Sequence, residues 1–409
     1  MTIALALEPE RDQHENGQVT IVEWAKHIVP PAPGRNCERG RRYFTFHLPQ
    51  SRILGQSFAY RRARRNWCNG AVHVFEGSDG CRLSADRETP TLLERCARNP
   101  ILTARDWPYS VHSVFNPGAV RLADGTTLLL CRVEDRRGMS HLCAARSHDG
   151  ISGWSIDTAP TLIDTPNEAC WGIEDPRITY VPELSRYAIT YTGITRSGAG
   201  VCLALTEDFR QFESLGFIMQ PNDRDAALLP RKIDGKFAVF HRPASVTAAH
   251  IWVSYSRDLR NWDHPQPVLK ARDGSWWDAQ RVGLAPPLLE TGSGWLMLYH
   301  GVRQGDTGCV YRVGTALLSL DDPTRCLARG DSWILGPESP YERVGDANNV
   351  VFPCGFTLGN DGDELRIYYG AANSCIGMAT GSVKKLLSFM GNGEDQSIQQ
   401  TVHGSNSRT

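Results

Sequence analysis

The sequence lacks an excess of charge of either sign. Its 44 Lys and Arg residues nearly balance its 45 Asp and Glu residues, which leaves a formal net charge of −1 over 409 residues. A chain balanced in this way has no whole-molecule attraction to nucleic acid or to an anionic membrane surface. We therefore expect no nucleic-acid partner, and any electrostatic chemistry must be local.

Long hydrophobic runs are also missing. The first residues, MTIALALEPERDQHENG, have no basic segment and only a short apolar stretch before Glu8. Secretory signals and membrane-spanning helices need longer apolar stretches with different flanks. The sequence therefore predicts a cytoplasmic protein without membrane contact.

Cysteine is present but lacks the spacings that would give it a structural role. The 12 cysteines include no CxxC pair and no cluster with histidine, and they are too sparse for a disulfide scaffold. We expect reduced thiols in the core, no metal site and no cofactor.

Helical periodicity is absent from residues 100 to 380, where DG, NPG and GSG turns divide the chain into short apolar segments. Five of these segments share one pattern, in which a turn precedes an apolar strand with a polar end. They are 124–135, 185–194, 234–243, 293–302 and 363–372. Their starts lie roughly 50 to 70 residues apart, enough for one four-stranded sheet per unit. We predict an all-β fold, a five-bladed β-propeller, with a sandwich or barrel as the alternative.

A second recurring element is a Ser/Thr-x-Asp turn followed by an aromatic residue. It occurs at 147–154, 206–212 and 256–262. Asp and Gly supply the backbone angles and hydrogen bonds that such turns need, so the pattern predicts the closing turns of β-meanders.

The flanks differ from the repeats. We predict a propeller domain at 96–387, an N-terminal extension at 1–95 and a disordered polar tail at 388–409. The extension contains RGRRY (39–43) and RRARRNW (61–67), which could contact nucleic acid or another subunit. A solvated surface is the favoured interpretation, because the rest of the chain balances this charge.

Polar side chains of chemical interest stand at the ends of the repeated apolar strands. They are Arg132, Glu134, Tyr191, His241, Arg242, His300, Tyr369 and, just beyond, Asn373. The innermost strands of a propeller line its axial tunnel. If the repeated strands are innermost, these ends converge on one mouth, which a sandwich would not explain.

The stretch WGIEDPRITY (171–180) places charges around a proline inside a strand-like segment. Side chains alternate along a strand, so we expect Glu174 and Asp175 to face opposite ways and Arg177 to share the face of Asp175. Pro176 fits an inner or edge strand. Asp175 is either a partly buried general acid or the partner of Arg177 in a structural ion pair, and the spacing leaves both open.

Cationic and phenolic residues gather at the boundaries of other apolar segments. These are Arg224, Arg242, Arg281, His300 and Tyr311. Arginine presents forked donors that match phosphate oxygens, so their convergence would make a preformed anion site. A neutral sugar would not require so much positive charge.

Seven ordered motifs then give a family resemblance. EDPR (174–177), FNPGAV (115–120), GWLMLYHGV (294–302), LLSLDDP (317–323), ILGPESPYERVGD (334–346), NNVVFPCG (348–355) and YYGAA (368–372) together resemble glycoside hydrolase family 130. This family comprises β-mannoside phosphorylases and hydrolytic relatives on a five-bladed propeller. The similarity runs from about Asn99 to about Leu387.

The resemblance implies an inverting enzyme with one protein carboxylic acid. Asp175 matches the general acid, which protonates the departing oxygen through the mannose 3-hydroxyl. Phosphate, a co-substrate, attacks the opposite face to give α-mannose 1-phosphate. By the same resemblance Arg224, Arg242, Arg281, His300 and Tyr311 bind phosphate, and Asn116, Arg132, Glu134 and Asn373 bind mannose.

Two positions depart from the family pattern. Arg281 stands where phosphorylases commonly have Lys, which keeps the charge but changes its geometry. Asn373 replaces the usual Asp, so a bond from a sugar hydroxyl there is no longer charge-assisted.

Three functions compete. The leading one is a phosphorylase acting on β-1,2- or β-1,4-linked mannosides. The second is a hydrolase of the same family, which lacks much of the phosphate cluster and uses further carboxylates as base. The third is a non-catalytic carbohydrate-binding propeller. The sequence leaves the linkage, the acceptor sugar and the formation of a homo-oligomer open.

Overall fold

The computed structural model describes residues 91–162, 171–219, 221–244, 249–305 and 308–391. Most of the predicted N-terminal extension, including both basic runs, and most of the predicted tail lie outside this range. No helix in the described ranges has the length and apolar character needed to cross a membrane.

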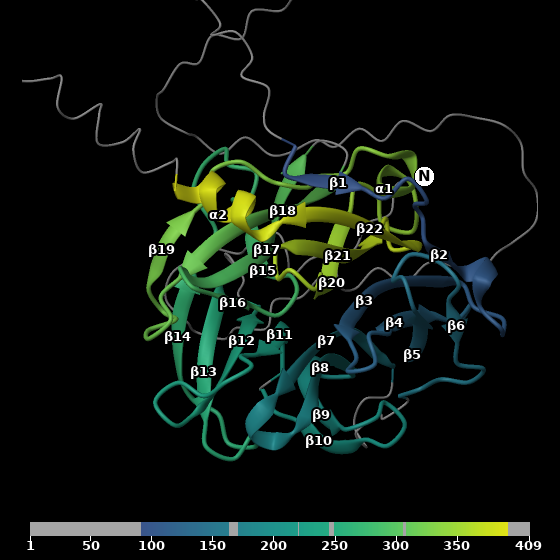
Figure 1. Cartoon of the computed structure of the whole chain (residues 1–409), viewed down its shortest axis with the longest axis horizontal. Helices are drawn as coiled ribbons and strands as arrows, with labels where there is room; N and C mark the ends of the chain where they lie inside the picture. The colour runs from purple at the N-terminus through teal and green to yellow at the C-terminus, as the bar shows by residue number, and fades with distance from the viewer. Residues whose placement is uncertain (1–90, 163–170, 220, 245–248, 306–307, 392–409) are drawn as a thin grey trace, which may run out of the picture. The chain divides into compact units, whose positions relative to one another are not determined.

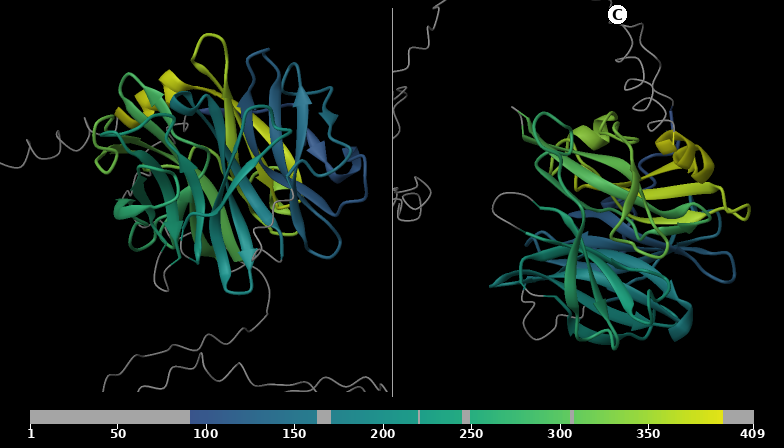
Figure 2. Two further views of the ribbon diagram at one scale, coloured as in Figure 1. Left: turned by 90° about the horizontal axis from the view of Figure 1, so that it is seen from below. Right: turned by 90° about the vertical axis from the view of Figure 1, so that its left-hand side faces the viewer.

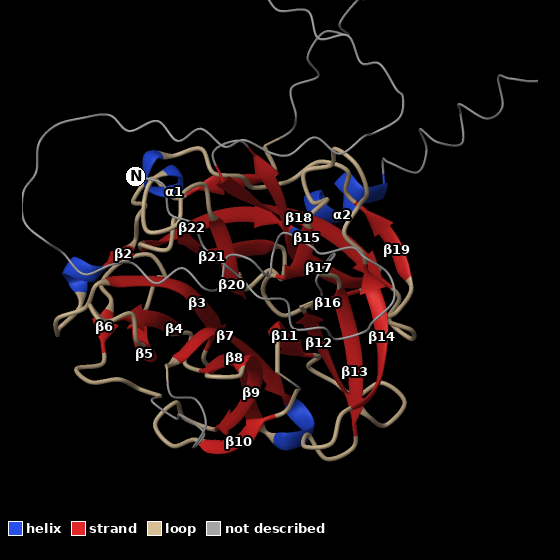
Figure 3. Ribbon diagram, turned by 180° about the vertical axis from the view of Figure 1, so that it is seen from behind, coloured by secondary structure: helices blue, strands red, loops and turns tan. Residues whose placement is uncertain are grey.

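The predicted five-bladed propeller is confirmed. Five antiparallel sheets stand around a common centre (Figure 1), and almost every regular element is a strand (Figure 3). Blade 1 contains β3 (Ser113–Arg121), β4 (Thr127–Glu134), β5 (Ser140–Ser147) and β6 (Ser155–Ile156). Blade 2 contains β7 (Ile173–Val181), β8 (Arg186–Thr195), β9 (Gly198–Thr206) and β10 (Glu213–Phe217). Blade 3 contains β11 (Asp223–Leu228), β12 (Phe237–Pro243), β13 (Ile251–Ser256) and β14 (Asp263–Leu269).

The last two blades carry additional short strands. Blade 4 contains β15 (Arg281–Leu284), β17 (Gly294–Gly305), β18 (Gly308–Leu318) and β19 (Cys326–Arg329), and β16 (Leu289–Thr291) pairs with β17. Blade 5 contains β20 (Val351–Leu358), β21 (Glu364–Ala371), β22 (Cys375–Ser382) and β1 (Leu93–Arg95), and β2 (Leu102–Thr103) pairs with β22. The helices are α1 (Pro340–Arg343) and α2 (Val383–Gly391), with 3-10 turns at Ala104–Asp106 and Pro182–Leu184.

The ring is closed by strands from both ends of the described chain. β1 and β2 precede blade 1 in sequence but pair antiparallel with β22 of blade 5. The ring closure therefore uses Leu93–Arg95, which lie before the predicted boundary at residue 96, and α2 continues beyond the predicted boundary at 387.

The predicted turns of the Ser/Thr-x-Asp type are confirmed, and each joins the third and fourth strands of its blade. In blade 2, Asp208 Oδ1 accepts the backbone N–H groups of Arg210 and Gln211. Asp149 and Asp258 make the corresponding pairs of bonds in blades 1 and 3. A short carboxylate that binds the backbone two and three residues on fixes these turns.

The hydrophobic core lies between neighbouring blades rather than at the centre. Five large clusters of buried side chains each join two adjacent sheets. Leu296 and Leu298 of β17, for example, share a cluster with Ile367 of β21. Packed sheets exclude water through such interdigitated faces, which leaves the axial region free for polar groups. Figure 2 shows the sheets stacked around the ring in side view.

The repeated apolar strands are not the innermost strands, and that expectation was wrong. They are β4, β8, β12, β17 and β21, the second strand of each blade. The innermost strands are β3, β7, β11, β15 and β20. They contact one another in turn from β20 through β3, β7 and β11 to β15, and β18 of blade 4 contacts β20 of blade 5. A second strand is covered on both faces and paired on both edges, so its apolar signal is the strongest in the sequence.

Candidate active site

A polar pocket lies where the innermost strands meet. Its volume is about 460 Å³. The lining side chains are Asn116, Arg132, Glu174, Asp175, Arg224, Asp225, Arg242, Ala244, Arg281, His300, Tyr311, Ala347, Val350, Phe352 and Asn373. Every residue that the family resemblance assigned to the site lines this pocket except Glu134, whose Oε2 accepts from Arg132 Nη2 at 3.2 Å.

The prediction that the polar ends of the repeated strands converge on one mouth holds for only some of those residues. Arg132, Arg242 and His300 reach the pocket from second strands. His241 instead is buried beside Asp223, with its Nδ1 2.6 Å from Asp223 Oδ2, and Tyr369 donates to Glu342 Oε1 at 2.8 Å. Neither of them lines the pocket, nor does Tyr191, because alternate residues of a second strand face the neighbouring blade.

Bulges in three innermost strands position the central side chains. The register shifts at Phe115/Gly118 in β3, at Glu174/Arg177 in β7 and at Arg224/Ala227 in β11. Each bulge contains one residue with positive φ: Asn116 at 46°, Asp175 at 53° and Asp225 at 53°. Asn and Asp tolerate this left-handed conformation better than other residues that carry a Cβ.

The bulge in β7 corrects one prediction. Glu174 and Asp175 both line the pocket, although simple alternation would send them to opposite faces. A bulge interrupts the alternation and re-aims a side chain. Blade 3 repeats this arrangement, because Arg224 and Asp225 are also adjacent and also both line the pocket.

The carboxylate of Asp175 is bound through one oxygen. Asn116 Nδ2 donates to Oδ1 at 2.9 Å, and Arg132 Nη1 donates to the same atom at 3.2 Å. No described residue donates a hydrogen bond to Oδ2. A protonated Asp175 would therefore hold its proton on Oδ2, because both donors compete for Oδ1.

A structural ion pair between Asp175 and Arg177 is not present. Arg177 is buried with 1% of its surface exposed, and it donates to the main-chain oxygen of Asp175 at 3.0 Å. Its charge instead faces Asp225, with Nη2 3.3 Å from Oδ1. Further bonds to the main-chain oxygens of Leu284 and Ala285 tie blade 2 to blade 4.

Arg132 gathers the carboxylates of the pocket. Besides Asp175 it binds Glu174 Oε1 at 2.8 Å and Glu134 Oε2 at 3.2 Å, and its guanidinium stacks on Phe115 at 4.5 Å. Burial raises the pKa of Glu174, opposed by Arg132 and reinforced by the charge of Asp175. Two adjacent carboxyl groups therefore share one guanidinium at the edge of the pocket.

The arginine-rich part of the pocket contains its own buried carboxylate. Asp225 Oδ2 accepts from Arg242 Nε at 2.6 Å and lies 3.5 Å from His300 Nε2. Burial alone would raise the pKa of Asp225, but Arg242 and Arg177 hold it below its usual range. Burial lowers the pKa of His300 to about 3, so its imidazole is neutral near pH 7.

Tyr311 and Arg281 complete this part of the pocket. Arg281 Nη2 donates to the hydroxyl oxygen of Tyr311 at 2.6 Å. Burial raises the pKa of Tyr311 against the opposing charge of Arg281, so the phenol keeps its proton and can donate it to an anion. Arg224 is more exposed and lies 3.8 Å from Glu174 Oε2.

Several buried polar atoms of the pocket have no protein partner within the described ranges. They are Asn116 Oδ1, Arg281 Nε and His300 Nδ1. Buried polar groups are nearly always hydrogen-bonded, so unpaired ones gathered in one pocket indicate a site for a polar ligand.

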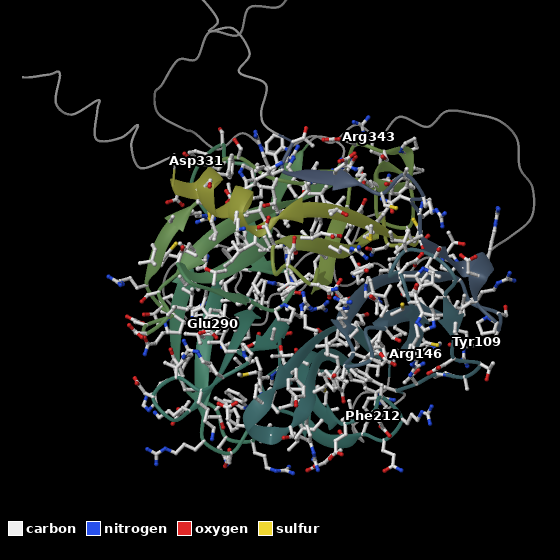
Figure 4. The ribbon with its side chains drawn as sticks, viewed as in Figure 1. Tyr109, Arg146, Phe212, Glu290, Asp331 and Arg343 are labelled. Carbon is white, nitrogen blue, oxygen red and sulfur yellow. The ribbon has the colours of Figure 1, made fainter. Side chains whose placement is uncertain are left out.

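The two kinds of chemistry occupy different blades. Blades 5, 1 and 2 supply what we call the carboxylate side: Asn116, Arg132, Glu174, Asp175 and Asn373. Blades 3 and 4 supply the guanidinium side: Arg224, Arg242, Arg281, His300 and Tyr311. A ligand in the pocket thus meets carboxyl groups on one side and mainly guanidinium, imidazole and phenol groups on another. Figure 4 shows side chains crowding the centre of the ring, whereas the labelled Tyr109, Phe212 and Arg343 lie at its periphery.

Another hollow of the molecule, and its acidic and metal-binding residue types, give weaker indications of a functional site. A larger hollow of about 1000 Å³ lies between blades 2 and 3, lined by residues such as Phe217, Met219 and Trp262, but charged groups do not converge on it as they do in the axial pocket. Within the described ranges, no group of three or more His, Cys, Asp and Glu side chains could hold a metal ion.

Comparison with known proteins agrees with the resemblance seen in the sequence. The family described as beta-1,4-mannooligosaccharide phosphorylase matches residues 87–392. A 1,2-beta-oligomannan phosphorylase of Thermoanaerobacter sp. (strain X514) is 33% identical over 307 residues, covering 72% of this chain and 98% of that protein. A beta-1,4-mannooligosaccharide phosphorylase of Ruminococcus albus is 30% identical over 310 residues, covering 73% of this chain and 91% of that protein.

Among solved structures, the chain is similar to a beta-1,2-mannobiose phosphorylase from Listeria innocua in complex with beta-1,2-mannobiose. The TM-score is 0.67 at 28% identity, over 73% of this chain and 99% of that one. A structure described as a glycoside hydrolase of the GH130 family that targets beta-1,2 mannosidic linkages gives a TM-score of 0.61 at 25% identity, over 72% and 94%.

Proposed function

The chain belongs to glycoside hydrolase family 130, and from this premise we propose that it cleaves β-1,2- or β-1,4-linked mannosides with inorganic phosphate and releases α-mannose 1-phosphate. The named relatives are phosphorylases of both linkages. The substrates are a mannoside and phosphate, and the reaction needs no cofactor.

The observation that carries this proposal is the division of the pocket between blades. An inverting displacement needs the proton donor and the nucleophile on opposite faces of the sugar. Asp175 comes from blade 2, whereas Arg242, Arg281 and His300 come from blades 3 and 4. A mannose ring between the two sides would meet an acid on one face and a bound anion on the other.

Asp175 is the general acid in this scheme. Its Oδ2 is the oxygen without a described donor, so it is available to give a proton to the departing oxygen, relayed in the family's scheme through the mannose 3-hydroxyl. After the transfer, Asn116 and Arg132 stabilise the carboxylate, because both already donate to Oδ1. The proton ends on the released acceptor sugar.

Phosphate is the nucleophile, and it needs a binding site rather than a base. The guanidinium groups of Arg242 and Arg281 and the phenol of Tyr311 provide donors, and an anionic nucleophile attacks the anomeric carbon without further activation. The carbon–oxygen bond to phosphate forms as the glycosidic bond breaks, which gives the α-phosphate from a β-mannoside.

A hydrolase is the alternative within the family. Such an enzyme needs a second carboxylate that activates water on the face opposite the acid. Glu174 is a second carboxylate, but it is adjacent to Asp175 and binds the same arginine. Its position on the carboxylate side favours phosphate over water as the nucleophile. A non-catalytic carbohydrate-binding propeller would bind a neutral sugar, which does not require the arginines of the guanidinium side.

A panel assay tests this proposal. The protein is incubated with β-1,2-mannobiose, β-1,4-mannobiose and β-1,4-mannosyl-glucose, each with and without phosphate, and mannose 1-phosphate and free mannose are quantified. We expect mannose 1-phosphate from at least one substrate, and only when phosphate is present. Free mannose formed equally well without phosphate would identify a hydrolase instead.

A further inference from the structure

Asp225 was not among the residues predicted from the sequence, yet it occupies the centre of the guanidinium side. Its surface is 4% exposed, and it is the residue of the β11 bulge with positive φ. It lines the same pocket as the arginines around it. A buried carboxylate beside an anion site repels phosphate. Its presence there therefore requires a role that offsets this repulsion.

The contacts of Asp225 divide between its two oxygens. Oδ1 lies 3.3 Å from Arg177 Nη2, and Arg177 is itself fixed by main-chain oxygens of blades 2 and 4. Oδ2 accepts from Arg242 Nε at 2.6 Å and lies near His300 Nε2. One oxygen is thus anchored to the scaffold, and the other binds groups of the guanidinium side.

This contact fixes the guanidinium group of Arg242 through its Nε atom. Asp225 uses the Nε donor of Arg242, and within the described residues no partner occupies its Nη1 and Nη2 atoms. A guanidinium fixed through Nε keeps its two Nη groups for a forked contact with a tetrahedral oxyanion. Binding costs less when the donor is already oriented.

Gly283 makes room for this arrangement. A Cβ added to Gly283 on β15 would lie 2.6 Å from Asp225 Oδ2 and 2.5 Å from His300 Nε2, which is closer than real contacts allow. The absence of a side chain at this position therefore permits Asp225 and His300 to approach each other across the inner strand.

We propose that Asp225 is a positioning residue for the phosphate nucleophile, which acts by fixing Arg242 through Nε so that the free Nη groups of this arginine face the bound oxyanion. This assignment rests on the proposed function for its substrate, phosphate. Asp225 touches neither sugar nor phosphate in this scheme, and its effect passes through the Arg242 side chain that it holds.

Two variants and one control test the assignment. Asp225→Asn keeps the volume but leaves a single acceptor oxygen for Arg177 and Arg242. Gly283→Ala keeps every charge but displaces the Asp225 carboxylate. Asp278→Asn is the control, because Asp278 is also fully buried and binds Arg329 and Tyr299, yet does not line the pocket.

Initial rates are measured with phosphate varied at saturating mannoside, and with mannoside varied at saturating phosphate. We expect Asp225→Asn and Gly283→Ala to raise the phosphate KM by roughly tenfold or more, the scale on which outer partners affect metal ligands. The mannoside KM should stay within about twofold of the wild-type value, because the variants leave the groups that bind the sugar unchanged. Asp278→Asn should lower Tm without changing the phosphate KM.

Direct phosphate binding separates this assignment from the proposed function. Isothermal titration of inorganic phosphate into the wild type and the two variants needs no turnover. A wild type without phosphate-dependent turnover would end the proposed function, while weaker phosphate binding by both variants would still support positioning. If Asp225→Asn does not fold, Gly283→Ala decides alone. An unchanged phosphate KM and affinity in folded variants, or tighter binding after loss of the negative charge, would overturn the assignment.

Discussion

Asn116 on β3 donates a hydrogen bond to Asp175 on β7, with 2.9 Å between Nδ2 and Oδ1. Both residues have positive φ and both stand in bulges of innermost strands, so the same backbone device in two neighbouring blades brings donor and carboxylate together. This contact joins blades 1 and 2 in the lining of the pocket and orients the carboxyl group that we assign as the acid.

Removal of the Asn116 amide should slow the chemical step. Asn116→Gly deletes the donor while tolerating positive φ. We expect kcat to fall by roughly tenfold, because a hydrogen bond to a charged group contributes about 1.5–3 kcal/mol. The phosphate KM should not change. Asn360→Ala is the control, since Asn360 accepts a hydrogen bond from the exposed Arg121 and neither residue lines the pocket. An equal loss of kcat in both variants would contradict the role of Asn116.

Asp175→Asn should abolish turnover with the fold intact. Asparagine accepts the same backbone conformation but has no carboxyl proton to give. General acid catalysis contributes about 10²- to 10⁴-fold, so kcat should fall by at least about a hundredfold. The check combines kcat with a thermal melt. Substantial residual activity in a folded variant would remove Asp175 from the acid role.

Arg242→Ala should chiefly raise the phosphate requirement. The variant loses a charge-assisted donor and leaves Asp225 buried without that partner. We expect the phosphate KM to rise by roughly tenfold to a hundredfold, with a smaller change in the mannoside KM. Arg242→Lys keeps the charge but lacks the forked donors of arginine, so its phosphate KM should lie between those of the wild type and Arg242→Ala. A phosphate KM equal to that of the wild type in Arg242→Ala would count against the proposed guanidinium side.

Glu342 on α1 should stabilise the ring closure in a pH-dependent way. It is fully buried and binds Arg95 of β1 and Tyr369 of β21. Burial raises its pKa, but Arg95 and two backbone N–H groups outweigh that effect and lower the pKa below its ordinary value of 4.5. A lowered pKa contributes stability above 4.5, and this contribution disappears as the pH falls through the folded-state value.

Urea unfolding of Glu342→Gln at several pH values checks this. We expect a loss of at least about 2 kcal/mol at pH 7, somewhat below the roughly 3–5 kcal/mol of a fully broken buried pair, because Gln keeps an acceptor. The difference from the wild type should shrink as the pH falls below the ordinary carboxyl value of 4.5. Glu338→Gln removes the exposed partner of Arg95 and should cost less than about 1 kcal/mol. A difference independent of pH would contradict the assignment.

The sequence predicted the propeller because turns and apolar strands leave strong local signals. It assigned those strands to the wrong place in the blade, because the most apolar strand is the doubly covered second one, and bulges interrupt the pattern of β3, β7, β11 and β20 among the innermost strands. The family resemblance indicated nine of the pocket-lining residues by number, from Asn116 to Asn373.

Backbone conformation explains most of what the sequence missed. Glu174 was placed away from the pocket because strict alternation ignores a bulge, and the Asp-Pro pair at 175–176 was the available signal for one. The sequence analysis did not select Asp225, although this residue directly follows Arg224, which it did select. Its contact with Arg177 joins blades 2 and 3 across 48 residues of sequence, and no local spacing reveals such a meeting.

The central claim is that an acid on one side of the pocket and a bound anion on the other act on opposite faces of one sugar. Proton NMR of the first product formed from a β-mannoside and phosphate tests it most directly, because the anomeric signals of the two mannose 1-phosphates differ. We expect the α-anomer alone at early times. The β-anomer, or free mannose without a phosphate ester, would contradict the arrangement of acid and anion described above.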